Sequence, residues 1–188
     1  MTARDALGST VTSFTDNVTS AIGTNPHGGT LTATKSVAAT AGMATFTGPD
    51  SLSNDSADVG YKLRASSGVL TDTLSTAFDV VPATATQLAF TVQPVNTTAN
   101  TAIAPAVEVT AYDAQGNKAT NFNGDVTVAI DADPVGGSQL GGTKTVTAIN
   151  GVATFSTLTI DQVGSRFKLN AAFFGSPPVV ASALFDTP

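Results

Sequence analysis

The fold is decided most clearly by residues 107–117, which read VEVTAYDAQGN. Val107, Val109 and Ala111 alternate with polar or larger residues, which is the pattern of a β-strand with one buried face. The strand pattern then gives way to a turn around Gly116, because glycine tolerates the positive φ that tight turns need. An alternating strand that ends in such a turn predicts antiparallel β-structure in this part of the chain.

This pattern occurs twice in the chain. Thr2–Gly8, with the sequence TARDALG, returns as Thr110–Gly116, with the sequence TAYDAQG. Further pairs follow in the same order and at nearly constant spacing: Asn17–Ile22 with Asp125–Ile130, Gly42–Phe46 with Gly151–Phe155, Tyr61–Leu63 with Phe167–Leu169, and Phe78–Asp79 with Phe185–Asp186. A repeat of this length corresponds to a whole domain, so the sequence predicts a tandem array of domains.

The second copy contains the more regular strand pattern. Alternating apolar residues predict strands at 88–92, 107–111, 126–130, 143–149, 153–155, 167–171 and 179–185. Asn150-Gly151 predicts a tight hairpin turn. No segment has the i, i+3, i+4 spacing of apolar residues that is typical of an amphipathic helix. About seven short strands in about 100 residues are typical of an immunoglobulin-like β-sandwich. We therefore expect an all-β chain of tandem immunoglobulin-like sandwiches.

We expect the first repeat to lack its N-terminal strands. Its sequence begins at Thr2, which corresponds to Thr110, whereas residues 86–109 have no counterpart in it. The predicted organisation is an incomplete repeat at residues 1–81, a short linker at 82–86 and a complete repeat at 87–188.

The segment without a counterpart would carry much of a domain's core. It contains Leu88, Phe90, Val92, Val107 and Val109. Burying each such side chain is worth about 1.5–3 kcal/mol, so together they contribute about 7–15 kcal/mol. That sum is comparable to the whole stability of a domain. The first repeat is therefore expected to fold poorly alone, and to expose sheet edges and an apolar groove that invite a strand from another chain. The alternative is that the sequence is a fragment of a longer array and starts at an internal position, and this alternative is favoured.

Composition narrows the classes of function. The net charge is −6 and only 12% of residues are charged, which argues against nucleic-acid binding. Cysteine is absent, so the chain has no disulfide scaffold, no thiolate metal site and no cysteine nucleophile. The sequence contains no apolar run of about 18 residues, so we expect no membrane insertion. The N-terminal residues do not resemble a signal peptide, so any export signal is expected to lie outside this chain.

Three short motifs resemble bacterial immunoglobulin-like (Big-type) tandem repeats of large prokaryotic surface and adhesin proteins. The motifs are Leu88-x-Phe90-x-x-Gln93-Pro94, then Val107-x-Val109-x-Ala111-x-Asp113-x-x-Gly116-Asn117, and Gly151-Val152-Ala153-Thr154-Phe155. The resemblance covers the second copy fully and the first copy from Thr2 onward. It implies a spacer or stalk unit in an extracellular array, and it carries no catalytic residues over.

The ionisable residues give only weak signs of chemistry. His27 is the single histidine, and an exposed loop histidine is favoured over a member of a Ser/His/Asp arrangement. Asp131 and Asp133 could supply oxygen ligands to calcium, but aspartate in a turn commonly bonds its own backbone. The first copy has Gly23 and Asn25 at the corresponding positions, so a calcium site would be specific to the second repeat. No other cofactor is predicted.

Three aromatic residues are candidates for an interaction surface. Phe173 and Phe174 precede Gly175 and a Pro-Pro pair in a predicted loop, and Tyr112 ends a predicted strand. Adjacent aromatic residues at a loop tip can form an interaction patch. The alternative is that one phenylalanine caps the end of the sandwich, and this alternative is favoured.

These observations favour a non-enzymatic structural repeat, a spacer or stalk of a prokaryotic protein that is extracellular or at the cell surface. Its expected partners are neighbouring immunoglobulin-like repeats or copies of itself. One alternative is a subunit of an extracellular fibre, in which a strand from another chain completes the open first repeat. Another is a module that binds a cell-surface carbohydrate or other ligand. An enzyme is the least expected class.

Overall fold

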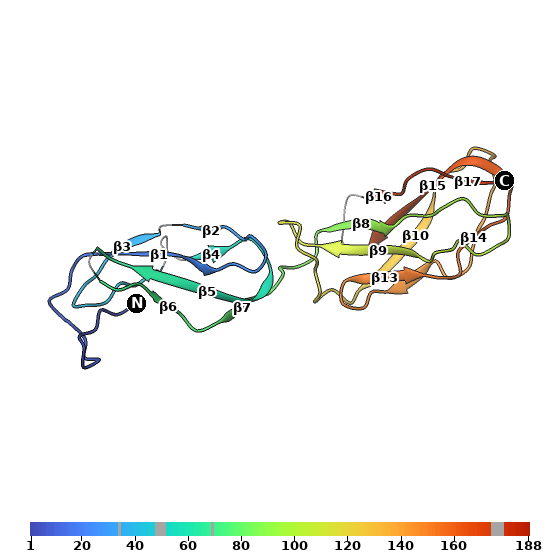
Figure 1. Ribbon diagram of the computed structural model, residues 1–188. Coiled ribbons are helices and arrows are strands. Elements are labelled where there is room, and N and C mark those ends of the chain that lie inside the picture. Colours follow the sequence, from blue (N-terminus) through green and yellow to red (C-terminus); the bar gives the residue numbers. More distant parts are fainter. Residues whose placement is uncertain (34, 48–51, 69, 174–178) are drawn as a thin grey trace. The chain divides into compact units, whose positions relative to one another are not determined.

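The computed structural model describes residues 1–33, 35–47, 52–68, 70–173 and 179–188 (Figure 1). The chain divides into two compact units, Met1–Val81 and Pro82–Pro188. The first unit contains β1 (Asn17–Thr24), β2 (Leu31–Thr32), β3 (Ser36–Ala38), β4 (Ser53–Asn54), β5 (Asp58–Ser66), β6 (Thr73–Leu74) and β7 (Phe78–Val80). The second contains β8 (Gln87–Val92), β9 (Val107–Tyr112), β10 (Asp125–Ala132), β11 (Leu140–Gly141), β12 (Thr145–Thr147), β13 (Val152–Phe155), β14 (Thr159–Ile160), β15 (Gly164–Phe173), β16 (Val180–Ala181) and β17 (Phe185–Thr187).

The second unit is a sandwich of two antiparallel sheets. One sheet has the strand order β13-β9-β8. The other has the order β12-β10-β15-β16, and β17 also pairs with β15. β8 and β9 thus share a sheet with the later strand β13, whereas β10, β12, β15, β16 and β17 form the opposite sheet. β11 and β14 pair with each other in a separate two-stranded sheet. This distribution of strands is that of an immunoglobulin-like sandwich. It confirms the all-β, immunoglobulin-like prediction.

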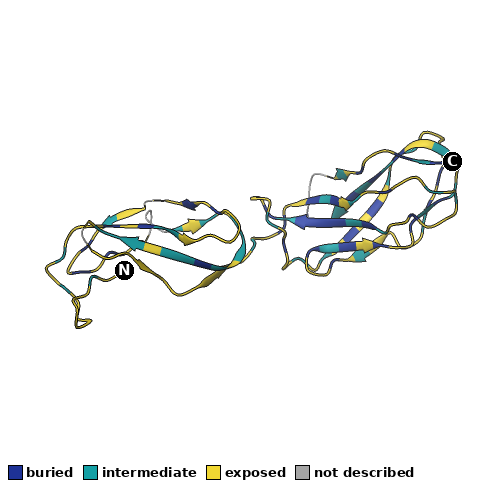
Figure 2. Ribbon diagram, viewed as in Figure 1, coloured by how far each residue is buried: buried dark blue, intermediate teal, exposed yellow. Residues whose placement is uncertain are grey.

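The inner faces of the two sheets form the core of this unit. Val107, Val109 and Ala111 of β9 are at most 1% exposed, as are Val126 and Val128 of β10. In β10 the residues between them are exposed, so burial there has the period of two read from the sequence, whereas in β9 Thr110 is buried as well, at 3% exposed. Figure 2 shows these buried positions along the strands of the second unit.

The first unit retains only one of the two large sheets. Its sheet β3-β1-β5-β6, with β7 also on β5, matches the second unit's sheet β12-β10-β15-β16 with β17. The described residues contain no counterpart of β8, and a single bridge, Thr2 to Met43, stands where β9 pairs with β13. In the second unit the equivalent pair is Thr110 with Val152. The prediction that the first sandwich lacks its N-terminal strands is confirmed.

The core of the first unit is correspondingly small. Its buried cluster consists of Val18, Ala39 and Ala44, with Phe14, Phe46 and Ala65 packed against it while partly exposed. Phe155 and Ala171, the second-unit counterparts of Phe46 and Ala65, are completely buried. A sheet that has lost its facing layer cannot exclude water from its inner side chains, so the same residue types are half-buried in one unit and buried in the other.

Three buried polar atoms of the first unit have no hydrogen-bond partner among the described residues. They are Ser20 Oγ, Asn54 Nδ2 and Tyr61 Oη. The corresponding residues of the second unit are Val128, Ile160 and Phe167, all of which belong to its hydrophobic core. An unsatisfied buried polar group typically costs about 1–3 kcal/mol. The core of the first unit therefore contributes less to its stability than that of the second, because it is smaller and contains unpaired polar atoms.

The predicted hairpin at Asn150-Gly151 is shorter than expected. The turn forms, with φ of 50° at Asn150 and 79° at Gly151, and Ile149 and Val152 exchange two backbone hydrogen bonds across it. Beyond that pair the strands separate, because β12 joins β10 in one sheet and β13 joins β9 in the other. The turn thus passes the chain between layers, and the strand expected at 143–149 covers only Thr145–Thr147.

Residues 82–86, the predicted linker, are grouped with the second unit. The Ala83 N–H donates to the Asp113 carboxylate at 3.0 Å, and the Thr86 N–H donates to the Tyr112 carbonyl at 2.8 Å. Ala85 is 7% exposed and belongs to the core. Whether these residues also act as a linker between separately folding repeats stays a prediction. No helix among the described residues is long and apolar enough to cross a membrane.

Candidate functional site

The turn at Asp113 is built around a buried carboxylate. Asp113 is 1% exposed, and its Oδ1 accepts hydrogen bonds from the backbone N–H groups of Gln115 at 3.0 Å and Asn117 at 2.9 Å. Its Oδ2 accepts from Asn117 Nδ2 and from the Ala83 N–H, both at 3.0 Å. Burial raises the pKa of this carboxyl, but the hydrogen bonds from Asn117 and from two further backbone N–H groups outweigh it and hold the pKa below 3.8.

The first repeat forms the same turn at its surface. Asp5 Oδ1 accepts from the N–H groups of Leu7 and Ser9, each at 2.9 Å. Gly8 has a φ of 84° and the corresponding Gly116 has 85°. A carboxylate that bonds the backbone two and four residues ahead organises a turn. The role of Asp5 and Asp113 is therefore structural in both repeats.

A second pair of equivalent carboxylates holds the end of each repeat. Asp79 Oδ1 accepts from the Gly60 N–H at 2.9 Å, and Asp186 Oδ1 accepts from the Arg166 N–H at 2.7 Å. Both bonds join the last strand of a unit to the start of β5 or β15. Each of the four repeated aspartates, Asp5, Asp79, Asp113 and Asp186, thus accepts at least one hydrogen bond from a backbone N–H group.

The calcium candidates lie where β10 ends. Asp133 Oδ1 accepts from Ser138 Oγ at 2.7 Å and from the N–H groups of Val135 and Gly136, and Asp133 Oδ2 accepts from the Ser138 N–H at 2.8 Å. The Ser138 hydroxyl, followed by these backbone donors, lowers the pKa of the Asp133 carboxyl. Asp131 is exposed on β10. Within the described ranges no group of three or more histidine, cysteine or acidic residues could hold a metal ion.

The carboxylate oxygens of Asp133 therefore already serve as turn acceptors, as the alternative interpretation expects. A calcium ion at Asp131 and Asp133 would have to compete with four hydrogen bonds to Asp133. Calcium binding by these two residues stays a prediction.

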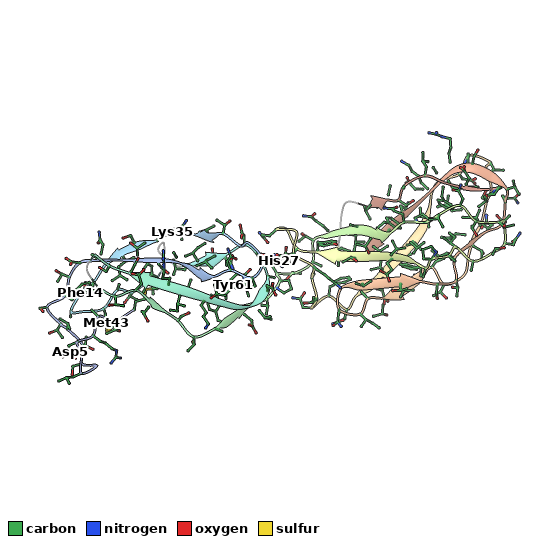
Figure 3. The ribbon with its side chains drawn as sticks, in the orientation of Figure 1. Asp5, Phe14, His27, Lys35, Met43 and Tyr61 are labelled. Carbon is green, nitrogen blue, oxygen red and sulfur yellow. The ribbon has the colours of Figure 1, made fainter. Side chains whose placement is uncertain are left out.

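His27 lies in an exposed loop of the first unit, at the opposite end from Asp5 (Figure 3). Its side chain is 73% exposed, and its Nδ1 lies 3.3 Å from a carboxylate oxygen of Asp58. The hydrogen bonds between described residues include none from a serine hydroxyl to His27. The structure thus gives His27 a carboxylate neighbour at the surface, and a Ser/His/Asp arrangement is not assembled by the described part of the chain.

The aromatic candidates do not form one cluster. Phe173 is the last residue of β15, and its ring packs edge-on against Phe122 with a centroid distance of 5.0 Å and an interplanar angle of 65°. It caps the core rather than projecting from a loop. Tyr112 is half-buried at the end of β9, and no ring contact between described residues joins it to Phe173. Phe174 lies outside the described residues.

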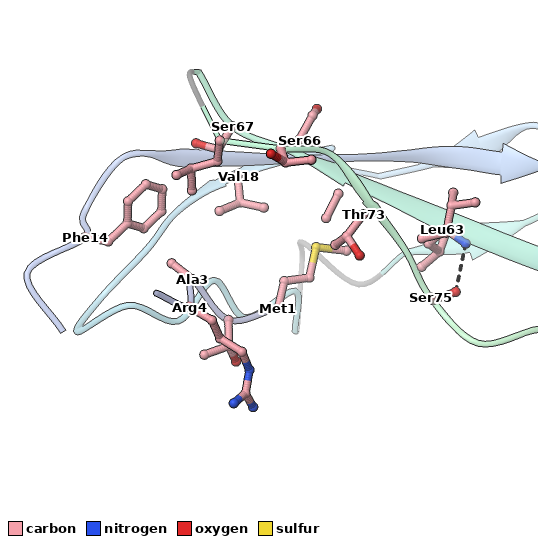
Figure 4. Close-up of a pocket in the computed structure, with 15 residues that line it drawn as sticks. Met1, Ala3, Arg4, Phe14, Val18, Leu63, Ser66, Ser67, Thr73 and Ser75 are labelled. Atoms are coloured by element: carbon pink, nitrogen blue, oxygen red, sulfur yellow. Dashed lines mark hydrogen bonds between the residues drawn. The ribbon is translucent and has the colours of Figure 1, made fainter. Parts of the chain in front are cut away.

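The most distinctive surface feature is an open groove of about 770 Å³ in the first unit (Figure 4). Its floor is formed by Val18 of β1 and by Leu63 and Ala65 of β5. One wall contains the N-terminal residues 1–4, and the other contains Leu70, Thr71 and residues 73–75 around β6. Ser75 Oγ accepts a hydrogen bond of 3.0 Å from the Leu63 N–H at this wall.

The second unit shows how this groove is normally closed. The counterparts of its floor are Val126, Leu169 and Ala171, and each is at most 1% exposed. They share one core cluster with residues of β8 and β9, the strands for which the first unit has no counterpart. The groove therefore marks the place of a missing sheet.

Comparisons with known proteins add little to this description. No family model matches the chain, and no curated protein matches it. Three chains among the solved structures match, and one is described as "D0-D1 domain of Intimin". That match covers 92% of this chain and 81% of the other, with 20% sequence identity and a TM-score of 0.39. Because identity and score are both low, the fold assignment rests on the strand pairing described above.

Proposed function

We propose that this chain is a non-enzymatic structural repeat, a spacer or stalk of a prokaryotic protein that is extracellular or at the cell surface. The supporting observation is that the residues shared by its two repeats make the same backbone contacts in both. Asp5 and Asp113 organise the same turn, and Asp79 and Asp186 hold the same strand end. The contacts that the two copies share are thus ones that hold turns and strand ends in place.

Several further equivalent contacts support this proposal. The N–H of Ser75 donates to the Leu63 carbonyl, as that of Ser182 does to the Leu169 carbonyl, each at 2.8 Å. The pairings of β1 with β5 and of β10 with β15 each shift register at the equivalent place. A repeat that preserves its ladders and turns while its surface diverges fits a load-bearing or spacing role. The extracellular placement draws on the resemblance to Big-type surface repeats.

A ligand-binding module is the weaker proposal. Its aromatic candidates are Phe173, which packs against Phe122, and Tyr112, which is half-buried. Neither presents an aromatic face in a cluster with the other. No observation on the described residues favours this function over the spacer.

A spacer must hold its two units at a defined separation, and this can be measured directly. The chain contains no cysteine, so cysteines introduced at the equivalent exposed positions Thr19 and Thr127 are the only sites for spin labels. We expect the distance between the two labels to have a single narrow distribution. A Thr127→Cys and Thr154→Cys pair, which spans the two sheets of the second unit, provides the width expected for a rigid body.

A distribution as broad as that of a flexible tether would contradict the spacer proposal. Circular dichroism of each labelled variant must first match that of the unmodified chain. This control separates a mobile connection between two folded units from a loss of folding in the first unit.

A further inference from the structure

Two asparagine residues of the chain are followed by glycine, Asn123 and Asn150. An asparagine in this position can react with its own backbone, because the amide nitrogen of the next residue can attack the side-chain carbonyl carbon and close a five-membered ring. A glycine leaves this approach unobstructed, since it has no side chain. Both pairs contain the same reacting groups, so the folded structure decides which of them can react.

The surroundings of Asn150 hold its reacting partner in place. Gly151 is buried, and its N–H donates to the Phe122 carbonyl at 3.0 Å. The backbone groups of Ile149 and Val152 exchange two hydrogen bonds that close the turn around the pair. Ring formation at Asn150 therefore requires this turn to open first.

Asn123 is held much less firmly. It is exposed, and its side-chain amide makes two hydrogen bonds of 3.4 Å, one donated to the Asn121 carbonyl and one accepted from the Asn150 N–H. These are long compared with the usual distance of about 2.9–3.0 Å. The N–H of the half-buried Gly124 donates no hydrogen bond to any residue that the structure describes. Both reacting groups at Asn123 are thus available while the protein is folded.

The backbone on either side of Asn123 is anchored to the turn that contains Asn150. The Phe122 carbonyl accepts from the Gly151 N–H at 3.0 Å, and the Gly124 carbonyl accepts from the Ala148 N–H at 2.9 Å. These two bonds tie the segment before β10 to the turn in which the chain passes from one sheet to the other. The spacing between the bonds is set by the length of the backbone at Asn123.

We propose that Asn123 is a site of spontaneous modification, at which the folded chain converts its own asparagine to aspartate and isoaspartate. The Gly124 nitrogen forms a bond to Cγ of Asn123, the bond from Cγ to the side-chain nitrogen breaks, and that nitrogen leaves as ammonia with the proton of the Gly124 N–H. Water then opens the ring. Addition of water at Cγ gives aspartate, and addition at the backbone carbonyl carbon gives isoaspartate, whose backbone is longer by one carbon. This proposal does not depend on the spacer function.

The products would change the turn in two ways. Both place a new carboxylate close to Asp125, which is exposed and accepts a hydrogen bond from the Thr147 hydroxyl. Repulsion between exposed charges is weak, so this effect is expected to be small. Isoaspartate also lengthens the backbone between the Phe122 and Gly124 carbonyls. We therefore expect isoaspartate to loosen the hydrogen bonds that these carbonyls accept.

The test is to incubate the full 188-residue chain at mildly alkaline pH and to follow both sites by peptide mass mapping, with electron-transfer fragmentation to identify isoaspartate. Asn123 should convert at least about 10-fold faster than Asn150 in the folded protein, because only Asn150 requires opening of the turn. In concentrated urea the two rates should agree within about threefold, since the unfolded chain no longer distinguishes the sites.

Variants separate the modification from its effect on the turn. Asn123→Gln should remove the modification, because the longer side chain would have to close a less favourable six-membered ring. Asn150→Gln is the matched control and should leave the rate at Asn123 unchanged. After incubation, hydrogen exchange should be faster at the amides of Ala148 and Gly151 in the unmodified sequence but not in Asn123→Gln.

Three results would overturn the proposal, provided that circular dichroism shows the chain to be folded during incubation. One is equal conversion of Asn123 and Asn150 in the folded protein. Another is the same ratio of rates in urea as in buffer, which would assign the difference to neighbouring residues in the sequence. The third is formation of aspartate without isoaspartate, which would indicate direct hydrolysis of the side chain without a ring.

Discussion

Tyr61 and Phe167 occupy the same position in the two repeats and differ by one hydroxyl group. Both side chains are completely buried, and each packs against the phenylalanine of the last strand, with ring centroids 6.1 Å apart for Tyr61 and Phe78 and 6.0 Å apart for Phe167 and Phe185. Only the first repeat must bury a polar atom there. The Tyr61 hydroxyl has no hydrogen-bond partner among the described residues.

Tyr61→Phe should therefore stabilise the first unit, by about 1 kcal/mol, because it removes an unsatisfied buried hydroxyl without changing the ring. The measurement is urea unfolding of the full chain, followed by a probe in residues 1–81. Tyr112→Phe is the matched control, because Tyr112 is only half-buried, and it should change the free energy of unfolding by less than about 0.5 kcal/mol. A destabilised Tyr61→Phe variant would show that the hydroxyl has a partner.

Asp113 and Asp5 organise the same turn at different depths. Asp113→Ala should destabilise the second unit by about 2–4 kcal/mol, because four hydrogen-bond donors lose a buried, charged acceptor. Asp5→Ala should cost the first unit only about 0.5–1.5 kcal/mol, since its two donors can bond to water instead. Chemical denaturation of the two single variants compares these costs. Equal losses of unfolding free energy in the two variants would mean that burial of the carboxylate does not determine how much its hydrogen bonds contribute to stability.

The same carboxylate makes stability depend on pH. The pKa of Asp113 is lowered in the folded protein, so its contribution is fully present above the unfolded value of about 3.9. It is lost as the pH falls through the lower, folded value. We expect the free energy of unfolding of the second unit to decrease as the pH falls below about 4, and to decrease less steeply in Asp113→Asn. Parallel slopes for the two proteins would contradict this.

At the scale of elements, the start of β15 contains an unfavourable backbone conformation. Arg166 has a φ of 71°, in the left-handed region that favours glycine, and its counterpart Gly60 has a φ of 82°. Both stand where the pairing with the last strand shifts register, between Gly164 and Phe167 in one unit and between Asp58 and Tyr61 in the other. The bend is required by the fold, and only the first repeat uses the residue that tolerates it.

Arg166→Gly should stabilise the second unit by about 0.5–1 kcal/mol, because it relieves the left-handed strain and the Arg166 side chain is exposed. Gly60→Ala should destabilise the first unit by about 1 kcal/mol for the opposite reason. Thermal unfolding of both variants gives the two signs. A loss of stability in Arg166→Gly would show that the guanidinium or its aliphatic stem makes a contribution larger than the strain.

At the scale of the whole molecule, the two units should differ in stability. Among the described residues the buried core cluster of the first unit contains three residues, whereas that of the second unit combines residues of both sheets. We expect limited proteolysis to cleave within residues 1–81 first and to leave a resistant fragment close to 82–188. Mass spectrometry identifies the fragments, and calorimetry should show two transitions. A single cooperative transition with cleavage distributed over both units would contradict the incomplete-domain description.

Local patterns in the sequence are sufficient to predict the repeat, the all-β class and the incomplete first sandwich. The alternation at Val107, Val109 and Ala111 is local and has the period of a strand, so it predicts burial without knowledge of the partner. The comparison of the two copies located the segment without a counterpart, residues 86–109, and with it predicted an apolar groove in the first repeat. The turns at Gly8 and Gly116 could also be predicted, because glycine tolerates the positive φ that such turns need.

Which strands pair in a sheet, and which buried polar atoms have a hydrogen-bond partner, follows from the three-dimensional packing of the chain. Asn150-Gly151 predicts a hairpin, yet β12 pairs with β10 and β13 pairs with β9 in the other sheet, where Ala153 and Phe155 of β13 are buried in the core between the two sheets. The four hydrogen bonds to Asp133, the packing of Phe173 on Phe122 and the missing partner of Tyr61 depend on the three-dimensional arrangement of their surroundings. Strand pairing and the hydrogen bonding of buried polar atoms depend on contacts between residues that are distant in the sequence. The alternation of apolar residues along a single strand carries no information about those contacts.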